Sequence, residues 1–228
     1  MIENLNLQLQ SVREIGLLIF KDFLSHHSSR KAFLNTIAYF DSGYSYSGSE
    51  LKHSSIGMIT IKAFGRDGSF QSDGIKELLP FDNRSFATKR IVEGDIVVAH
   101  TDLTKNCDII GSSQIVQDNY GFDEMTFSMD LVRVRSKNKA FSQALIYEYL
   151  LNDFKEWALQ HCSGTTVVHL QKSALNTFAI DLLNTEDAYF LSKKLDALNS
   201  KETNLIRKIR SLSKAKKLLL NKYFGSIS

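Results

Sequence analysis

The chain has 228 residues, of which 43% are hydrophobic, and its 15 phenylalanines and 8 tyrosines supply apolar surface for a packed core. This composition excludes wholesale disorder, and no stretch approaches the roughly 20 apolar residues of a membrane-spanning helix. The net charge is only +3, yet residues 193–222 hold ten basic and two acidic side chains, a local charge of +8. Such asymmetry favours a polyanion or an acidic protein as partner, and for most of these lysines taken singly a solvated helix face is an equal interpretation.

The N-terminal segment, residues 1–24, predicts a helix. Its polar opening, "MIENLNLQLQ", lacks the basic start and apolar run of a signal peptide. Apolar or small residues then recur in steps of three and four, the spacing of one helix face. They are Ile2, Leu5, Leu9, Val12, Gly16, Ile19 and Phe23.

The middle of the chain, residues 25–180, predicts one α+β domain. Strands are expected at 57–64, 94–99, 106–111 and 125–136, which are rich in β-branched residues and bounded by Gly, Asp or Asn. Helices are expected at 30–38 and 142–160. The order of these elements has no regular βαβ rhythm, so a doubly wound sheet is not predicted.

The C-terminal segment, residues 181–228, predicts a long coiled-coil helix. Apolar residues recur in alternating steps of four and three from Leu191 to Tyr223, which is the a/d seam of a coiled coil sustained over more than four heptads. Asn184 or Thr185 would cap the start and Gly225 would end the helix, which would span roughly 55–60 Å. The apolar seam positions expected to mediate dimer or coiled-coil contact are Leu191, Leu195, Leu198, Leu205, Ile209, Leu212, Leu219 and Tyr223.

Charged Glu202 and Lys216 interrupt this seam, which indicates either selection of a register or partner, or simple imperfection. The N-terminal helix repeats the seam pattern at an offset of 200, so that Val12 matches Leu212 and Phe23 matches Tyr223. The two helices are therefore expected to pair, within one chain or between chains.

No catalytic or metal-binding motif emerges from the sequence. The histidines and the two cysteines, Cys107 and Cys162, fit no zinc spacing, and we expect free thiols in a reducing cytoplasm. No phosphate-binding glycine motif occurs. His100 and Asp102 would share a strand face, which leaves a hydrolase as a weak third reading, but no obvious nucleophile accompanies them.

Hydroxyl-bearing and basic residues gather instead in four loops of the middle domain. Such side chains on loops carried by a sheet suit contacts to nucleic-acid grooves and phosphates. The candidate DNA-binding residues are Ser42, Gly43, Tyr44, Tyr46, Lys62, Arg66, Thr101, Thr104, Lys105, Ser163, Thr165, Thr166 and Lys172. The "SGTT" turn at 163–166 either faces DNA or ties the long helix to the domain.

The order of these motifs resembles the specificity (S) subunit of type I restriction–modification systems over almost the whole chain. The segments that carry the resemblance are "LLIFKDFL" (17–24), "FDSGYSYSGSEL" (40–51), "GMITIKAFGRDGSF" (57–70), "VEGDIVVAHTDLT" (92–104), "SQALIYEYLLNDFKEWA" (142–158), "SGTTVVHLQKSAL" (163–175) and "KAKKLLLNKYF" (214–224). The family's proline-rich step before the long helix is replaced by "FAIDLLNTEDAYFL", which puts the angle of that helix in question. With one domain, the chain resembles half of a full subunit, natural or engineered.

The resemblance implies a non-catalytic reader of double-stranded DNA. Residues 25–180 would be a target recognition domain for one half of a bipartite target, between an N-terminal conserved-region helix (1–24) and a spacer helix (181–228). Methyltransferase subunits would supply S-adenosylmethionine, a restriction subunit would cleave, and a homodimer would read two half-sites. The alternative is a coiled-coil adaptor whose globular domain binds an acidic protein.

Overall fold

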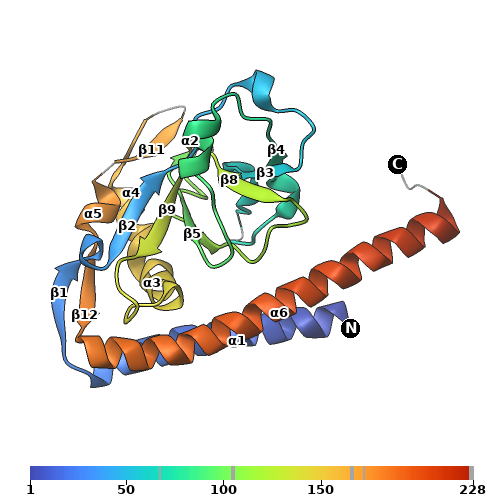
Figure 1. The fold of residues 1–228 in the computed structure, drawn as a ribbon. Coiled ribbons are helices and arrows are strands. Elements are labelled where there is room, and N and C mark those ends of the chain that lie inside the picture. Colours follow the sequence, from blue (N-terminus) through green and yellow to red (C-terminus); the bar gives the residue numbers. More distant parts are fainter. Residues whose placement is uncertain (67, 104–105, 165–166, 172, 226–228) are drawn as a thin grey trace.

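Two long helices pack side by side beneath a globular domain (Figure 1). The computed structural model describes residues 1–66, 68–103, 106–164, 167–171 and 173–225. Helix α1 (Ile2–His26) leads into strand β1 (Ser29–Phe33), and β1 pairs antiparallel with β12 (Ala179–Leu183), which precedes α6 (Thr185–Phe224). The end of α1 therefore meets the start of α6, and the two helices run antiparallel along each other.

The predicted limits of the long helix are confirmed. The Asn184 side chain accepts a hydrogen bond from the Asp187 amide at 2.9 Å, and Glu186 and Asp187 place acidic groups at the positive end of the helix dipole. Gly225, with φ of 77°, ends the 40-residue helix. The predicted pairing of the two helices occurs within one chain.

Besides the β1–β12 pair, the described residues of the globular domain form three small sheets, which confirms the predicted α+β class. A four-stranded antiparallel sheet has the order β2 (Ala38–Ser42), β9 (Leu131–Ser136), β5 (Ile96–Ala99), β7 (Ser113–Ile115). A second has the order β4 (Lys76–Glu77), β3 (Ile56–Ile59), β8 (Glu124–Phe127), with β3 and β8 parallel. A third has the order β10 (Cys162–Ser163), β11 (Val168–Leu170), β6 (Thr101–Asp102).

Short helices and helical turns connect these strands. They are α2 (Asn83–Thr88), α3 (Gln143–Tyr149), the π-helical turn η5 (Leu150–Phe154), α4 (Lys155–Gln160), α5 (Ala174–Thr177), and the 3-10 turns η1 (Leu34–Thr36), η2 (Gly48–Glu50), η3 (Ile61–Ala63) and η4 (Ser72–Gly74). One core cluster joins Ile96 of β5, Leu145 of α3, Phe20 of α1 and Leu191 of α6, all of which are completely buried. The first turns of the long helix are therefore part of the same core as the sheet.

Several elements differ from the sequence prediction, and the strand expected at 125–136 is divided into β8 and β9 by a turn at 128–130. The helix expected at 30–38 is wrong, because residues 29–33 form β1, whose backbone pairs with β12 about 150 residues away. The strand expected at 106–111 is also wrong. Cys107 and Gly111 adopt positive φ values of 55° and 73°, which an extended strand does not allow, and the Asp102 carboxylate holds the Ile109 and Ile110 amides in a turn. The strand expected at 57–64 ends early, and η3 follows it.

Candidate DNA-recognition surface

The strands of the four-stranded sheet bring together, at one of their ends, loops that are far apart in the sequence. Strand β2 ends at Ser42, β5 ends at Ala99, and β9 begins at Leu131, all at the same end of the sheet. The backbone of 128–130 joins the loops that leave this end. The Met129 amide donates to the Tyr44 carbonyl at 3.0 Å, and the His100 amide donates to the Asp130 carbonyl at 2.9 Å.

The other two predicted loops join the same region through the third sheet and through one ion pair. Thr101 lies opposite His169 in the β6–β11 ladder, and His169 lies opposite Ser163 in the β11–β10 ladder. The start of the "SGTT" turn therefore lies beside the 101–103 segment. Arg66 Nε lies 3.6 Å from Asp108 Oδ2, which places the loop that follows η3 beside the 106–109 turn. The described parts of all four loops thus form one connected region.

Three of the predicted DNA-binding residues are buried and have structural roles. A side chain on Gly43 would overlap the Ser128 carbonyl, whose oxygen lies 2.1 Å from the position of an added Cβ. Tyr44 is 3% exposed and donates its hydroxyl to Glu50 at 2.6 Å. Thr101 is 5% exposed, and its hydroxyl lies 3.2 Å from His169 Nδ1. These positions shape the loops and lack the exposure that a DNA contact requires.

Glu50 organises the first loop and was not predicted. Its buried carboxylate accepts hydrogen bonds from the Tyr44 hydroxyl, the Phe81 amide at 2.9 Å and the Ser47 amide at 2.7 Å. The hydrogen bond from Tyr44, followed by those from the two amides, lowers the pKa of Glu50 to about 2. The residues Ser47 to Glu50 form a capping box, so the spacing "SGSE" was the sequence signal that could have identified it.

The exposed members of the predicted set are Ser42, Lys62, Arg66 and Ser163. Tyr46 is half-buried, and burial together with the nearby Asp130 carboxylate raises the pKa of its hydroxyl. Exposed Leu103, Met129 and His169 also belong to this region, although the sequence did not single them out. The remaining candidates, Thr104, Lys105, Thr165, Thr166 and Lys172, lie outside the described residues.

The buried position of Asp102 argues against a hydrolase site formed by His100 and Asp102. Asp102 is completely buried, and its Oδ2 accepts hydrogen bonds from the Ile109 amide at 2.7 Å and the Ile110 amide at 3.1 Å. That carboxylate holds a turn together and is not presented to a substrate. Across the residues that the structure describes, no group of three His, Cys, Asp or Glu side chains could hold a metal ion. No helix within the described ranges is long and apolar enough to cross a membrane.

The predicted seam divides into a covered part and a bare part. Leu191, Leu195 and Leu205 are buried in this chain, and Leu198, Ile209 and Leu212 are partly covered. Leu219 and Tyr223 are 55% and 71% exposed. The charge at seam position Glu202 pairs with Arg13 of α1 at 2.8 Å, which favours register selection over imperfection at that position.

The basic charge of α6 is also divided. Arg207 and Arg210 pair with Glu93 and Asp118 of the globular domain, both at 2.7 Å. Part of the local excess of positive charge is therefore neutralised within the chain. Lys214, Lys216 and Lys217 are exposed.

A solved structure resembles the chain over its whole length. The crystal structure of a type I restriction–modification system S subunit from M. genitalium superposes with a TM-score of 0.67 at 13% sequence identity, covering 100% of this chain and 57% of that one. The chain has the fold of a type I specificity subunit. The HsdS subunit from Thermoanaerobacter tengcongensis gives a TM-score of 0.52 at 16% identity, covering 98% of this chain and 57% of that one.

The chain thus spans 57% of the length of either S subunit. Its helix–domain–helix order and the α+β class match the type I specificity-subunit fold, as the motif order predicted. No family model matches the sequence, and no curated protein sequence matches it significantly.

Proposed function

We propose that this chain is a DNA-specificity subunit of a type I restriction–modification system. Its globular domain reads one half of a bipartite target in double-stranded DNA, and α6 helps to set the distance to the other half. Methyltransferase subunits supply S-adenosylmethionine and methylate adenine, and a restriction subunit supplies cleavage in the cytoplasm. The chain itself reads DNA and performs no chemistry.

The observation that carries the proposal is the match of the whole chain to the specificity-subunit fold, with loops gathered at one end of the strands of the four-stranded sheet. Whereas Gly68 and Ser69 of the 61–69 loop lie beside α1 and α6, the loops at 42–47, 101–103 and 128–130 emerge near α2 and β11, on the side of the domain away from those helices (Figure 1). This separation leaves the loops accessible to a duplex while the helices contact other subunits. Exposed Lys62 and Arg66 supply phosphate contacts, and Ser42, Tyr46 and Ser163 supply hydrogen-bonding groups.

The second reading head is proposed to come from a second copy of the chain. One half-site offers few base contacts, so linking two heads strengthens binding through their effective concentration. The bare part of the seam, at Leu219 and Tyr223, is the surface on which two copies would meet. Two identical heads related by a two-fold axis read inverted half-sites, so the expected target is symmetric and interrupted.

The alternative of an adaptor for an acidic protein has weaker support. It depends on the basic charge of α6, and two of those arginines already pair with carboxylates of the same chain. Saturable binding of a protein, together with DNA binding that is indifferent to sequence, would favour it.

Methylome sequencing tests the proposal directly. Cells that express this chain with its partner methyltransferase should acquire adenine methylation at one interrupted motif, absent from cells with the methyltransferase alone. The absence of any new motif would overturn the proposal.

Charge reversal tests the proposed surface. Lys62→Glu should weaken DNA binding and reduce the salt dependence of the binding constant by about one counterion, because a phosphate contact is lost. Lys21→Glu is the matched control, since Lys21 is an exposed lysine of α1 outside the proposed surface. Equal effects of the two changes would show that Lys62 acts only through net charge.

A further inference from the structure

One loop of the globular domain bonds closely to the middle of α6. The Thr203 hydroxyl donates to Gln117 Oε1 at 2.7 Å, and both residues are buried. Arg207 Nη2 donates to the Gln117 carbonyl at 2.7 Å. Arg210 Nη1 donates to both carboxylate oxygens of Asp118, at 2.7 and 2.9 Å. We call these five residues, with Tyr120, the clamp.

The domain side of the clamp is held in a fixed shape. Tyr120 adopts a φ of 53°, and its amide donates to Asp118 Oδ1 at 2.7 Å, which closes a tight turn. The Gln117 amide donates to the Tyr120 hydroxyl at 3.2 Å. The Tyr120 ring stacks on the Phe70 ring, with 5.1 Å between the ring centres. The guanidinium of Arg210, on α6, lies 4.5 Å from the centre of the Tyr120 ring. Asp118 therefore meets the helix as part of a braced turn.

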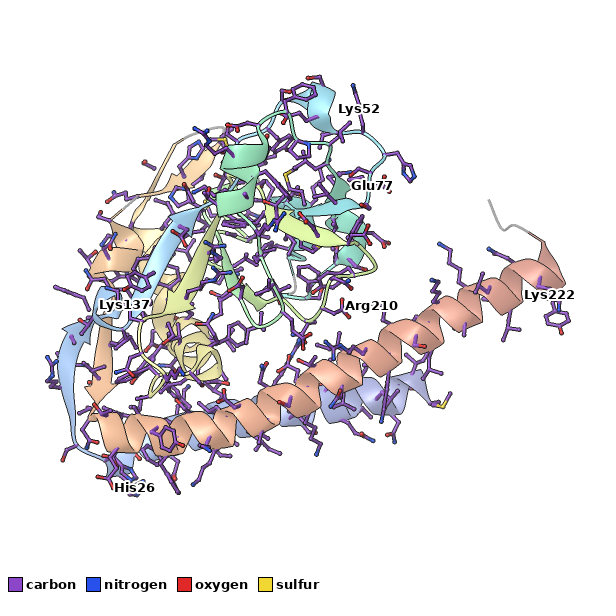
Figure 2. The ribbon with its side chains drawn as sticks, in the orientation of Figure 1. His26, Lys52, Glu77, Lys137, Arg210 and Lys222 are labelled. Atoms are coloured by element: carbon purple, nitrogen blue, oxygen red, sulfur yellow. The ribbon has the colours of Figure 1, made fainter. Side chains whose placement is uncertain are left out.

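The clamp lies where α6 leaves the domain. Figure 2 shows Arg210 between the helix and the globular domain, and Lys222 on the part of the helix that extends away from it. Within the described ranges, Arg210 is the last residue of α6 that bonds to the domain. Nearby, α1 holds the same stretch of helix through the Arg13–Glu202 ion pair.

We propose that the clamp fixes the angle of α6 relative to the recognition loops and thereby sets the spacing between two half-sites. This inference rests on the proposed function. From Arg210 to Phe224 the helix extends roughly 21 Å, so a tilt of about 10° moves its end by roughly 4 Å, close to the rise of one base pair. The clamp residues are positioning residues, because they act on spacing through the helix and not by touching DNA.

The chain offers a matched control for Arg210. Arg90 also combines an ion pair, with Glu124 at 2.8 Å, and a ring contact, with Phe86 at 5.7 Å. Neither partner of Arg90 belongs to α6. Arg90→Ala therefore removes the same types of interaction from the same domain without touching the clamp.

The first arm of the experiment measures the helix position without DNA. Spin labels at K52C and K217C, in a C107S/C162S background with the melting temperature of the original chain, report the distance between the domain and the end of α6. Arg210→Ala and Asp118→Asn should broaden the distance distribution, and Arg210→Lys should restore part of its sharpness. Arg90→Ala should leave it unchanged. An unchanged distribution in Arg210→Ala and Asp118→Asn would overturn the proposal.

The second arm measures spacing on DNA. The full chain, with its methyltransferase, is titrated with targets whose spacer is one base pair shorter or longer than the natural one. Arg210→Ala should reduce the discrimination against wrong spacers by about tenfold, the effect of one lost charge-assisted contact. Unchanged discrimination despite a broadened distance distribution would overturn the link to spacing. If the unmodified chain prefers no interrupted target, the proposed function fails, and the first arm still decides whether the clamp holds the helix.

Discussion

The two parts of α6 carry the same leucine spacing but have different surroundings. In the proximal part, residues 185–210, Leu191 and Leu195 are almost completely buried against α1 and the domain. In the distal part, residues 211–223, Leu219 and Tyr223 are exposed. The comparison shows that heptad spacing indicates a helix that needs a partner, while only the fold decides whether that partner is in the same chain.

The largest expected difference between the two parts is in core packing. Leu191→Ala should lower the free energy of unfolding by about 2–5 kcal/mol, because it leaves a cavity in a core that joins α6 to the sheet. Leu219→Ala should change it by less than about 0.5 kcal/mol, since that side chain is mostly in solvent. Chemical denaturation of both variants, at a concentration where the chain is monomeric, makes the measurement. Similar losses would show that the distal seam is also covered.

The two charged seam positions, Glu202 and Lys216, should also differ in their effect on stability, with the larger effect in the proximal part. Arg13→Ala should lower the free energy of unfolding by about 1–3 kcal/mol, because it leaves the Glu202 carboxylate, only 11% exposed, without its ion-pair partner. Lys216→Ala, at the exposed charged position of the distal seam, is the control and should have almost no effect. Thermal unfolding of the two variants compares them, and restored stability in the double variant Arg13→Ala/Glu202→Ala would locate the loss in the stranded carboxylate.

Sequence patterns predicted the long helices well because the responsible interactions are local. The Asn184 cap and the terminating Gly225 act within a few residues of the helix ends, and the β-branched run at 96–99 is a strand as expected. Strand β1 was missed because its partner lies about 150 residues away.

The candidate site could be predicted only as a set of loops. Tyr44 has the hydroxyl expected of a DNA contact, yet it faces the buried Glu50, and periodicity carries no information on that choice. The clamp was missed for the same reason as β1, since Asp118 and Arg210 are 92 residues apart. The basic residues of α6 suggested a polyanionic partner. Two of them, Arg207 and Arg210, instead pair with carboxylates of the same chain.

The proximal part should also respond to pH, through Glu148 of α3. Its Oε1 lies 3.0 Å from the position of a Cβ added to Gly16 of α1, and its Oε2 is buried without a hydrogen-bond partner among the described residues. Burial, and then the charge of Glu202, raise the pKa of Glu148 to about 7 from its ordinary 4.5. The folded chain therefore keeps a proton that the unfolded chain releases, and stability falls as the pH rises from about 4.5 to about 7.

Glu148→Gln should remove this penalty. Relative to the original chain, the variant should be more stable by roughly 3 kcal/mol at pH 8 and about equal in stability at pH 4. Denaturant titrations at the two pH values measure the difference, and Glu156→Gln, an exposed glutamate of α4, is the control. A difference that does not depend on pH would contradict the raised pKa.

The smallest effect on stability, and the most informative one for the distal part, is expected at Leu219. If a second copy covers this seam, Leu219→Glu should weaken self-association by at least about tenfold, because a charge would be buried where two apolar faces meet. Leu7→Glu is the matched control, since Leu7 of α1 is 60% exposed and Leu219 is 55% exposed. Sedimentation of the three chains over a range of concentrations gives the dissociation constants. If the original chain remains monomeric at every concentration, the proposal that a second copy covers the distal seam is wrong. The partner would then be a different protein, because the exposed apolar side chains of Leu218, Leu219, Leu220 and Tyr223 together form a surface typical of a protein interface.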